Sequence, residues 1–288
     1  MLNQRTTINC KGKLLDLKNP MVMGILNLTP DSFYDGGLYQ SDRNILKHVE
    51  KMLEEGAAII DVGGMSSRPG AMLINSKEEK RRILPAIKMI LKEFPAAILS
   101  VDTFRANVAK AAVDLGAAMI NDISAGNLDK KLFDMLAQLD VPYILMHMQG
   151  TPKTMQNKPQ YGDILVDILD FFIKKIAKLR ALGIKDIIID VGFGFGKELE
   201  DNYLLLQNLH AFQILELPLL AGLSRKSMIY KFLKITPASA LPSTSALHMI
   251  ALQQGAKILR AHDVGEAMQT IQLWQLLEKT KEKSQKYL

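Results

Sequence analysis

The chain has 288 residues, 48% of them hydrophobic, and its 36 basic and 30 acidic residues give a formal net charge of +6. No stretch approaches the roughly 18 uninterrupted apolar residues of a membrane span. An aromatic content of 6% argues against a nucleic-acid-binding surface. Cys10 is the single cysteine, which excludes an internal disulfide and a cysteine-based zinc site. Because the N-terminus lacks a signal-peptide pattern, we expect a cytoplasmic protein with neither membrane nor nucleic-acid partners.

Eight short apolar runs recur along the chain, and each stops at a polar or charged residue beside a turn former. Parallel strands that are buried on both faces have this continuous apolar character. Ligands of α/β proteins bind beyond the carboxyl ends of such strands, so the run ends indicate a site. The predicted strands are Met21–Asn27, Ala58–Asp61, Ala97–Asp102, Ala118–Asn121, Tyr143–His147, Ile187–Asp190, Pro218–Ser224 and Ile258–Arg260.

Amphipathic helical patterns alternate with these strands, and several end at a glycine that is typical of a helix C-cap. Between Asn44 and Glu55, for example, Ile45, Val49 and Met52 share one face. The predicted helices are Asn44–Glu55, Lys77–Lys92, Ala106–Leu115, Lys130–Leu139, Asp163–Leu182, Glu200–Leu209, Ser243–Gln254 and Gly265–Glu278.

Eight βα units fit a (β/α)8 TIM barrel better than a doubly wound sheet, which usually has about five or six strands. Barrels of about 250 residues commonly form one domain, and no linker interrupts this chain. We therefore predict an α/β fold with a single domain over residues 1–288 and the barrel over residues 21–280. Residues 1–20 are predicted to cover the barrel bottom with a short hairpin of Thr7–Cys10 and Leu14–Leu17.

Three loops rich in glycine follow predicted strands. Thr29–Tyr39 and Gly63–Ala71 come after the first two strands, and we expect them to be mobile lids or binding segments, with an ordinary solvated connection as the alternative. Gly192–Lys197 matches neither GxxxxGK[ST] nor GxGxxG. It is predicted only as a flexible loop that offers backbone amides, Phe195 and a lysine.

Cations gather at the ends of the last two strands, in Gly222–Ser227 and Arg260–Asp263. TIM barrels frequently bind phosphate with the loops that follow these strands, and Arg68 from the second loop is expected to join them. Arginine offers a fork for phosphate oxygens and lysine a point charge. This pattern favours a phosphate or pyrophosphate site. The alternative is that Arg225 or Lys226 pairs with a structural carboxylate.

Asp102, Asn121 and Asp190 end strands three, four and six, so their side chains are expected to converge over the barrel. Two carboxylates and an amide suit a heterocycle with several N–H donors, and they hold positive charge near it. The alternatives are a helix cap at Asp102, a turn residue at Asn121, and the start of the glycine loop at Asp190.

The sequence gives little support to a resident metal site. No HExxH motif occurs, and without cysteine pairs a zinc site is disfavoured. If pyrophosphate binds, Mg²⁺ is the natural ion, since it keeps several waters and needs only one or two protein oxygens besides phosphate. Asn27 or an aspartate of the first loop is the candidate ligand.

Eight blocks along the chain carry a further signal when they are taken together. They are MGILNLTPDSFYDGG at Met23–Gly37, SSRPG at Ser66–Gly70, SVDT at Ser100–Thr103, IND at Ile120–Asp122, LMHMQGTP at Leu145–Pro152, GFGFGK at Gly192–Lys197, SRKS at Ser224–Ser227 and RAHDV at Arg260–Val264. In this order, over about residues 20–275, the chain resembles the dihydropteroate synthases, a family of pterin-binding TIM barrels.

The resemblance implies a cytoplasmic, usually homodimeric enzyme of folate biosynthesis. Such enzymes join 6-hydroxymethyl-7,8-dihydropterin diphosphate to 4-aminobenzoate, giving 7,8-dihydropteroate and pyrophosphate, and sulfonamides compete for the aminobenzoate site. Departure of pyrophosphate leaves a cation on the pterin methylene, which neighbouring carboxylates, cations around the leaving group and Mg²⁺ would all favour. The amine of 4-aminobenzoate is the nucleophile.

The resemblance also implies a role for each matching residue. Those that would hold the pterin are Asp102, Asn121, Asp190 and Lys226, with Met146 packing beside it and Ser67 near the reacting end. Those that would hold the diphosphate are Arg68, Arg260 and His262, with Asn27 on Mg²⁺. Those that would shape the aminobenzoate pocket are Phe33, Pro69, Phe195 and Ser227. The catalytic set is then Asp102, Asp190, Lys226, Arg260 and His262.

The sequence departs from the family pattern at a few positions. Met65 stands where the family usually has glutamate, Ser67 replaces threonine but keeps the hydroxyl, and Val191 replaces proline. Loss of the glutamate puts the order of the second loop and the aminobenzoate affinity in doubt. Asp61 and His147 acquire no role from the sequence.

Two other functions stay open at the level of sequence. One is a different pterin-binding barrel, such as a methyltetrahydrofolate methyltransferase, which needs the pterin contacts but not the cluster of cations. The other is an inactive homologue that binds pterin without turnover, a hypothesis that Met65 motivates.

Overall fold

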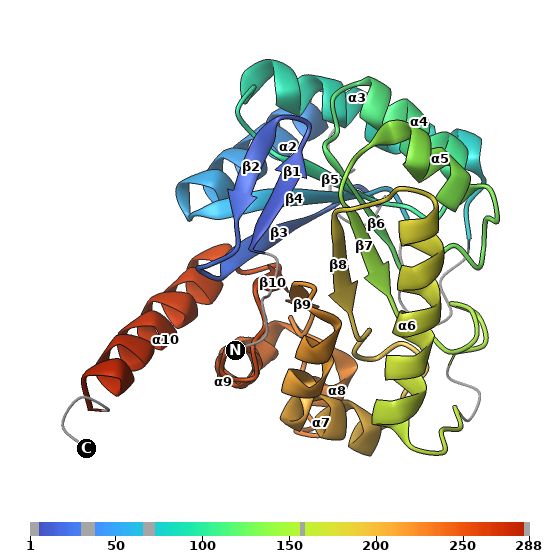
Figure 1. Ribbon diagram of the computed structural model, residues 1–288. Helices are drawn as coiled ribbons and strands as arrows, with labels where there is room; N and C mark the ends of the chain where they lie inside the picture. The colour runs from blue at the N-terminus through green and yellow to red at the C-terminus, as the bar shows by residue number, and fades with distance from the viewer. Residues whose placement is uncertain (1–5, 30–37, 66–72, 156–158, 285–288) are drawn as a thin grey trace.

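Eight parallel strands close into a barrel in the order β10-β3-β4-β5-β6-β7-β8-β9, and helices surround it (Figure 1). This computed structural model describes residues 6–29, 38–65, 73–155 and 159–284. The strands of the barrel are β3 (Met21–Asn27), β4 (Ala57–Gly63), β5 (Leu99–Asp102), β6 (Met119–Asp122), β7 (Tyr143–Met146), β8 (Ile187–Asp190), β9 (Leu219–Ala221) and β10 (Ile258–Ala261). The predicted TIM barrel is therefore confirmed.

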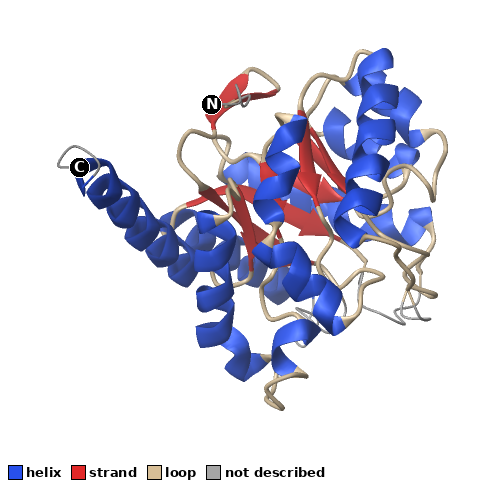
Figure 2. Cartoon of the chain, turned by 60° about the horizontal axis from the view of Figure 1, so that its bottom comes forward, coloured by secondary structure: helices blue, strands red, loops and turns tan. Residues whose placement is uncertain are grey.

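A helix follows each strand of the barrel, as the alternating pattern predicts. The α-helices are α2 (Leu38–Glu54), α3 (Ser76–Glu93), α4 (Ala106–Asp114), α5 (Leu132–Leu139), α6 (Ile164–Ala181), α7 (Leu199–Gln207), α8 (Ser227–Tyr230), α9 (Leu241–Gln253) and α10 (Val264–Ser284). None of the helices in the described part of the chain is long and apolar enough to cross a membrane. The C-terminal part of α10 projects away from the barrel (Figures 1 and 2).

Some boundaries differ from the prediction. β4 continues two residues past Asp61 to Gly63, and β9 is confined to Leu219–Ala221, within the longer run Pro218–Ser224. α2 starts at Leu38, inside the segment predicted as a loop. The sequence pattern also missed α8 and the 3-10 helices η1 (Leu209–Leu215) and η2 (Ala238–Ala240), because elements this short carry too few residues for a periodic signal.

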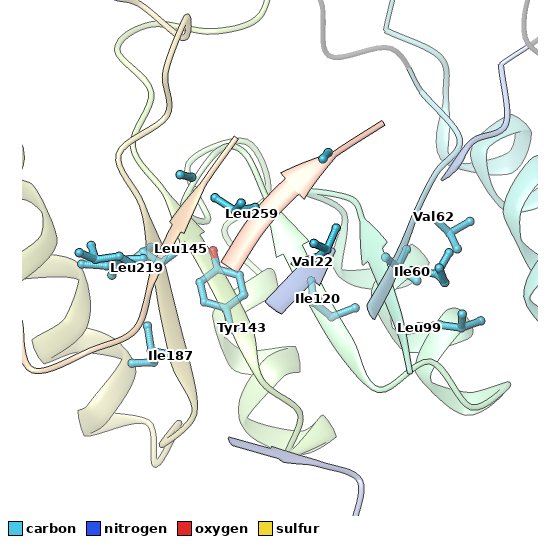
Figure 3. Packing of buried hydrophobic residues seen from close by; sticks show 14 of the residues in the cluster. Val22, Ile60, Val62, Leu99, Ile120, Tyr143, Leu145, Ile187, Leu219 and Leu259 are labelled. Carbon is cyan, nitrogen blue, oxygen red and sulfur yellow. The ribbon is translucent and has the colours of Figure 1, made fainter. Parts of the chain in front are cut away.

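The two-residue period of the strands separates two apolar clusters. Outward side chains pack between the barrel and its helices; Figure 3 shows part of this cluster, including Val22, Ile60 and Leu259. Inward side chains fill the lower half of the barrel. This second cluster contains Met23, Ile59, Ile98, Met119, Ile144, Ile188, Leu220 and Ile258.

The N-terminal hairpin covers the lower end of the barrel, as predicted. β1 (Thr7–Cys10) pairs antiparallel with β2 (Lys13–Asp16), one residue before the predicted Leu14 start. Lys11 and Gly12 form the connecting turn with φ values of 52° and 88°, the left-handed conformation that tight hairpins require. Ile8, Cys10 and Leu17 are buried in the same cluster as the inward side chains of the lower barrel.

Removal of a hairpin side chain from this cluster should lower stability. For Leu17→Ala, where the native side chain is 1% exposed, we expect the free energy of unfolding to fall by about 2–5 kcal/mol through lost burial and the cavity left behind. Leu14→Ala is the matched control, since Leu14 is 70% exposed, and it should change stability by less than about 0.5 kcal/mol. Urea denaturation measures both, and equal losses would contradict the role of the hairpin.

Candidate functional site

A polar layer lies directly above the apolar lower half of the barrel. Side chains two residues apart on a strand share a face, so Asp61 follows Ile59 into the interior, Asn121 follows Met119, Asp190 follows Ile188, and Arg260 follows Ile258. The strand register brings neighbours together, pairing Gly63 with Asp102, Asp102 with Asn121, and Met146 with Asp190. The structure thus brings together the predicted Asp102, Asn121, Asp190, Arg260 and Met146.

Arg260 is the centre of a buried network. Its Nε donates to Asp61 Oδ2 at 2.7 Å, and its Nη2 donates to Asp102 Oδ2 at 3.1 Å. Asn121 Nδ2 donates to the same Asp61 Oδ2 at 2.9 Å. Asp61 is fully buried, and its Oδ1 has no hydrogen-bond partner among the described residues. Asp61, which the sequence left without a role, therefore connects the amide of Asn121 to the guanidinium.

Burial and charge act against each other on these groups. Burial raises the pKa of Asp102 above its ordinary value, although the Arg260 charge works to lower it. Burial also works to lower the pKa of Arg260, but the charges of Asp61 and Asp102 outweigh it, so that pKa lies above its ordinary value. The guanidinium therefore stays charged in the barrel mouth, beside carboxylates that it compensates.

Asp190 and Lys226 form a second charged group across the barrel mouth. Asp190 Oδ1 accepts a hydrogen bond from the Gly192 amide at 2.8 Å. A Cβ added at Gly222 would lie 3.8 Å from both Asp190 Oδ2 and Lys226 Nζ, so the two side chains line one space. Burial lowers the pKa of Lys226 to about 8, while Asp190 works to raise it. Burial likewise raises the pKa of Asp190, against the charge of Lys226.

An apolar wall stands beside this charged group. Met146 is buried with Ile123, Met148 and Met155, and Phe195 packs against them. Lys226 Nζ lies 4.8 Å from the centroid of the Phe195 ring and donates to the Phe193 carbonyl. Polar groups that face an apolar surface suit a flat ring with hydrogen-bonding edges.

His262 lies at the end of β10 and is held by Ser224. The His262 amide donates to Ser224 Oγ at 3.2 Å, and the same Oγ lies 3.0 Å from His262 Nδ1. When the hydroxyl donates to Nδ1, the ring proton resides on Nε2, which then acts as a donor. Ser227, also predicted for the site, begins α8 one residue after Lys226.

Arg225 pairs with a structural carboxylate, which is the alternative that the sequence left open, whereas its neighbour Lys226 lies beside Asp190. Arg225 Nε donates to Asp263 Oδ2 at 2.8 Å, and its Nη2 donates to Asp263 Oδ1 at 2.8 Å. Its Nη1 donates to the carbonyls of Pro237, at 2.8 Å, and Ala238. A left-handed backbone with φ of 51° turns Arg225 away from the direction of the strand.

The donor set fits a magnesium ion that arrives with a phosphate rather than a resident metal. Within the described ranges, no three His, Cys, Asp or Glu side chains form a group that could hold a metal ion. Asn27 ends β3, and a Cβ added at Gly63 would lie 3.5 Å from its Oδ1 and 3.6 Å from the Asp102 Cβ. One amide oxygen beside a carboxylate matches the few protein ligands that Mg²⁺ needs when phosphate and water supply the rest.

The structural alternatives for Asp102, Asn121 and Asp190 have different outcomes. Asp102 bonds to Arg260, and the N-cap position of α4 is Arg105, so Asp102 does not cap that helix. Asn121 is inside β6 and bonds to Asp61. Only Asp190 also serves the glycine loop, through the Gly192 amide. The predicted Phe33, Ser67, Arg68 and Pro69 lie outside the described residues.

Comparisons with known proteins relate the chain to one family. Residues 23–262 match the family model described as pterin binding enzyme. A dihydropteroate synthase of Escherichia coli K12 is 44% identical over 265 residues, covering 91% of this chain and 93% of that protein. A Yersinia pestis dihydropteroate synthase in complex with a sulfonamide drug has a TM-score of 0.89 at 40% identity, covering 95% and 99% of the two chains. A Xanthomonas albilineans dihydropteroate synthase in complex with 7,8-dihydropteroate has a TM-score of 0.85 at 37% identity, covering 94% and 98%.

The contacts of Arg225 predict a role in stability. Arg225→Met removes a bidentate pair in which both side chains are about one fifth exposed, at 23% and 21%. We expect a loss of about 1–3 kcal/mol in the free energy of unfolding. The control Lys110→Met removes an exposed pair with Asp114, at 52% and 55% exposure, and should change stability by about 0.5 kcal/mol or less. Thermal and urea unfolding measure the difference; losses of similar size would contradict it.

Proposed function

Because the chain belongs to the pterin-binding enzyme family and, within it, to the dihydropteroate synthases of folate biosynthesis, we propose that the polar layer of its barrel mouth binds the pterin. The enzyme condenses 6-hydroxymethyl-7,8-dihydropterin diphosphate with 4-aminobenzoate to give 7,8-dihydropteroate and pyrophosphate. The observation that carries the residue assignment is the network in which Asp61 and Asp102 bind Arg260 and Asn121 binds Asp61, next to Asp190 and Lys226.

Hydrogen bonding supports the pterin assignment. Asn121 donates its amide N–H to Asp61, so its carbonyl oxygen is the atom left to accept from a ring N–H. Asp102 and Asp190 are acceptors when ionised, and they suit the N–H-rich edge of a pterin. Lys226 supplies a donor for a ring oxygen or nitrogen, and Met146 packs on the flat face.

The cations of the barrel mouth, which lie among these carboxylates, suit the diphosphate. Arg260 and Lys226 bring positive charge, and His262 contributes an Nε2 donor when Ser224 occupies Nδ1. Arg68 completes this group in the proposal. Mg²⁺, held by Asn27 and the substrate phosphates, would add charge that stabilises the departing pyrophosphate.

The proposed reaction needs no nucleophilic side chain. The bond between the pterin methylene carbon and the diphosphate oxygen breaks, and its electron pair leaves with pyrophosphate. Asp102 and Asp190 stabilise the cation that forms on the pterin, because buried carboxylates act at low dielectric. The amine of 4-aminobenzoate then forms the new C–N bond and loses a proton. Phe195 and Ser227, with Phe33 and Pro69, are proposed to hold the aminobenzoate ring and its carboxylate.

Four further properties are proposals as well. We propose a homodimer, for which the exposed Leu273, Leu276 and Leu277 of the projecting α10 offer an apolar surface. We also propose a single domain over the whole chain and a cytoplasmic location, for which the sequence pattern is the support. The Yersinia pestis relative binds a sulfonamide drug, and we propose that this chain binds such drugs at its aminobenzoate pocket.

The role of Asp190 predicts a large kinetic effect. Asp190→Asn keeps the shape but removes the negative charge that faces the pterin cation, so turnover should fall at least about tenfold, which is roughly 1.4 kcal/mol of transition-state stabilisation. Steady-state pyrophosphate release measures it. Asp114→Asn, at an exposed position, should retain full turnover. Near-normal turnover of Asp190→Asn would refute the assignment.

The metal proposal predicts a dependence on Mg²⁺ and on Asn27. Pyrophosphate release should require both substrates, stop with EDTA, and return when Mg²⁺ is added. Asn27→Ala removes one of few protein ligands, and we expect the Mg²⁺ concentration for half-maximal rate to rise roughly tenfold, or about 1.4 kcal/mol. An unchanged Mg²⁺ requirement would contradict the role of Asn27, whereas release without 4-aminobenzoate would contradict the coupled reaction.

A further inference from the structure

Lys197 is a buried lysine with partners from two loops. It ends the Gly192–Lys197 loop after β8, and the residue is 4% exposed. Its Nζ donates to the Phe195 carbonyl at 3.0 Å and lies 3.0 Å from Nδ1 of His147, which follows β7. The His147 carbonyl is 3.5 Å away. Neither Lys197 nor His147 has a part in the reaction described above.

The charges around this pair make His147 the acceptor. Burial lowers the pKa of His147 to about 2, and the charge of Lys197 adds to this effect, so the ring is neutral near pH 7. Burial lowers the pKa of Lys197 to about 7; Asp190 and Asp201 raise it, and Lys226 lowers it. The ammonium form of Lys197 has only donors, so in that form Nζ donates to Nδ1 of the neutral imidazole.

The loops that carry Lys197 and His147 are in backbone contact. A Cβ added at Gly192 would lie 2.0 Å from the His147 carbonyl oxygen, and one added at Gly196 would lie 2.4 Å from that of Gln149. Only glycine permits this approach. Tyr161 Oη also donates to the Gly196 carbonyl at 2.6 Å. Lys197 therefore lies where the loop after β7 packs against the Gly192–Lys197 loop after β8 and holds it in place. We call this contact between the two loops the seam.

Phe195 is the residue through which this seam reaches the site. Its carbonyl is held by Lys197, while its ring lies 4.8 Å from Lys226 Nζ and packs against the cluster that contains Met146. A shift of the carbonyl would move the ring. The orientation of this apolar wall thus depends on the buried Lys197 side chain behind it.

We propose that Lys197 and His147 are positioning residues of the aminobenzoate site, and that together they hold the backbone of Phe195 so that its ring forms one wall of that site. The inference rests on the proposed placement of aminobenzoate beside Phe195. Neither residue touches a substrate. Because Asp102 and Asn121 have partners outside these two loops, disturbance of the seam should change aminobenzoate binding far more than pterin binding.

The first test replaces Lys197 by an uncharged side chain of similar length. For Lys197→Met, we expect the KM for 4-aminobenzoate, measured at saturating pterin diphosphate and Mg²⁺, to rise about tenfold or more. The calorimetric Kd of pterin diphosphate should stay within about threefold of wild type. An unchanged aminobenzoate KM would overturn the proposal. Equal weakening of both substrates would also overturn it, since that result indicates a general structural role.

Two variants of His147 provide a matched comparison. In His147→Asn the amide oxygen replaces Nδ1 as acceptor, whereas His147→Leu removes the acceptor. We expect the leucine variant to raise the aminobenzoate KM as Lys197→Met does, and the asparagine variant to restore most of the loss. Equal KM values for the two variants would contradict the proposal. This comparison decides the matter even if Lys197→Met fails to fold.

A double-mutant cycle with Phe195→Ala separates this inference from the proposed function. If Lys197 acts through Phe195, Lys197→Met should have little further effect on the aminobenzoate KM once the ring is absent. A full additional loss in the Phe195→Ala background would overturn the inference alone. If Phe195→Ala by itself leaves the aminobenzoate KM at the wild-type value, the placement of aminobenzoate beside Phe195 is wrong, and the inference fails with it.

Discussion

Compensation of buried charge at Arg260 is the interaction on which the barrel mouth depends. One guanidinium binds Asp61 from β4 and Asp102 from β5, and Asp61 in turn orients Asn121 from β6. A carboxylate buried without a partner costs several kcal/mol, so the site tolerates this density of negative charge only because the cation is present. In the proposed reaction the same negative charge favours a cationic pterin. The proposal thus gives one set of groups two tasks, charge compensation inside the barrel mouth and stabilisation of the pterin cation.

Strand alternation supplies this site with a rigid base. The inward positions of the lower barrel are apolar and packed against the hairpin, and the next inward positions along the same strands are Asp61, Asn121, Asp190 and Arg260. Side chains on packed strands hold their geometry better than side chains on loops. The described part of the site therefore rests on the strands of the barrel.

The sequence was sufficient for the barrel, because eight apolar runs and eight helical patterns leave few other topologies. It also located Asp102, Asn121 and Asp190, since each ends a run. Asp61 also ends a predicted run, but its role comes from contacts with Arg260 and Asn121, residues 199 and 60 positions away, which the sequence pattern does not reveal. The bond between Lys197 and His147 joins residues 50 positions apart, and spacing along the chain carries no sign of such a contact. Arg225 and Lys226 are adjacent cations whose different directions follow from a backbone dihedral, which composition does not encode.

Closure of the barrel joins its first strand to its last, since β10 pairs with β3. Arg260 therefore follows its partners Asp61 and Asp102 by 199 and 158 residues. At a synthesis rate of about 5–20 residues per second, roughly 10–40 seconds separate the emergence of Asp61 from that of Arg260. Throughout that interval Asp61 and Asp102 lack the guanidinium that pairs with them in the folded barrel. A nascent chain can form its early βα units, but the network around Arg260 is complete only after the last strand of the barrel has emerged.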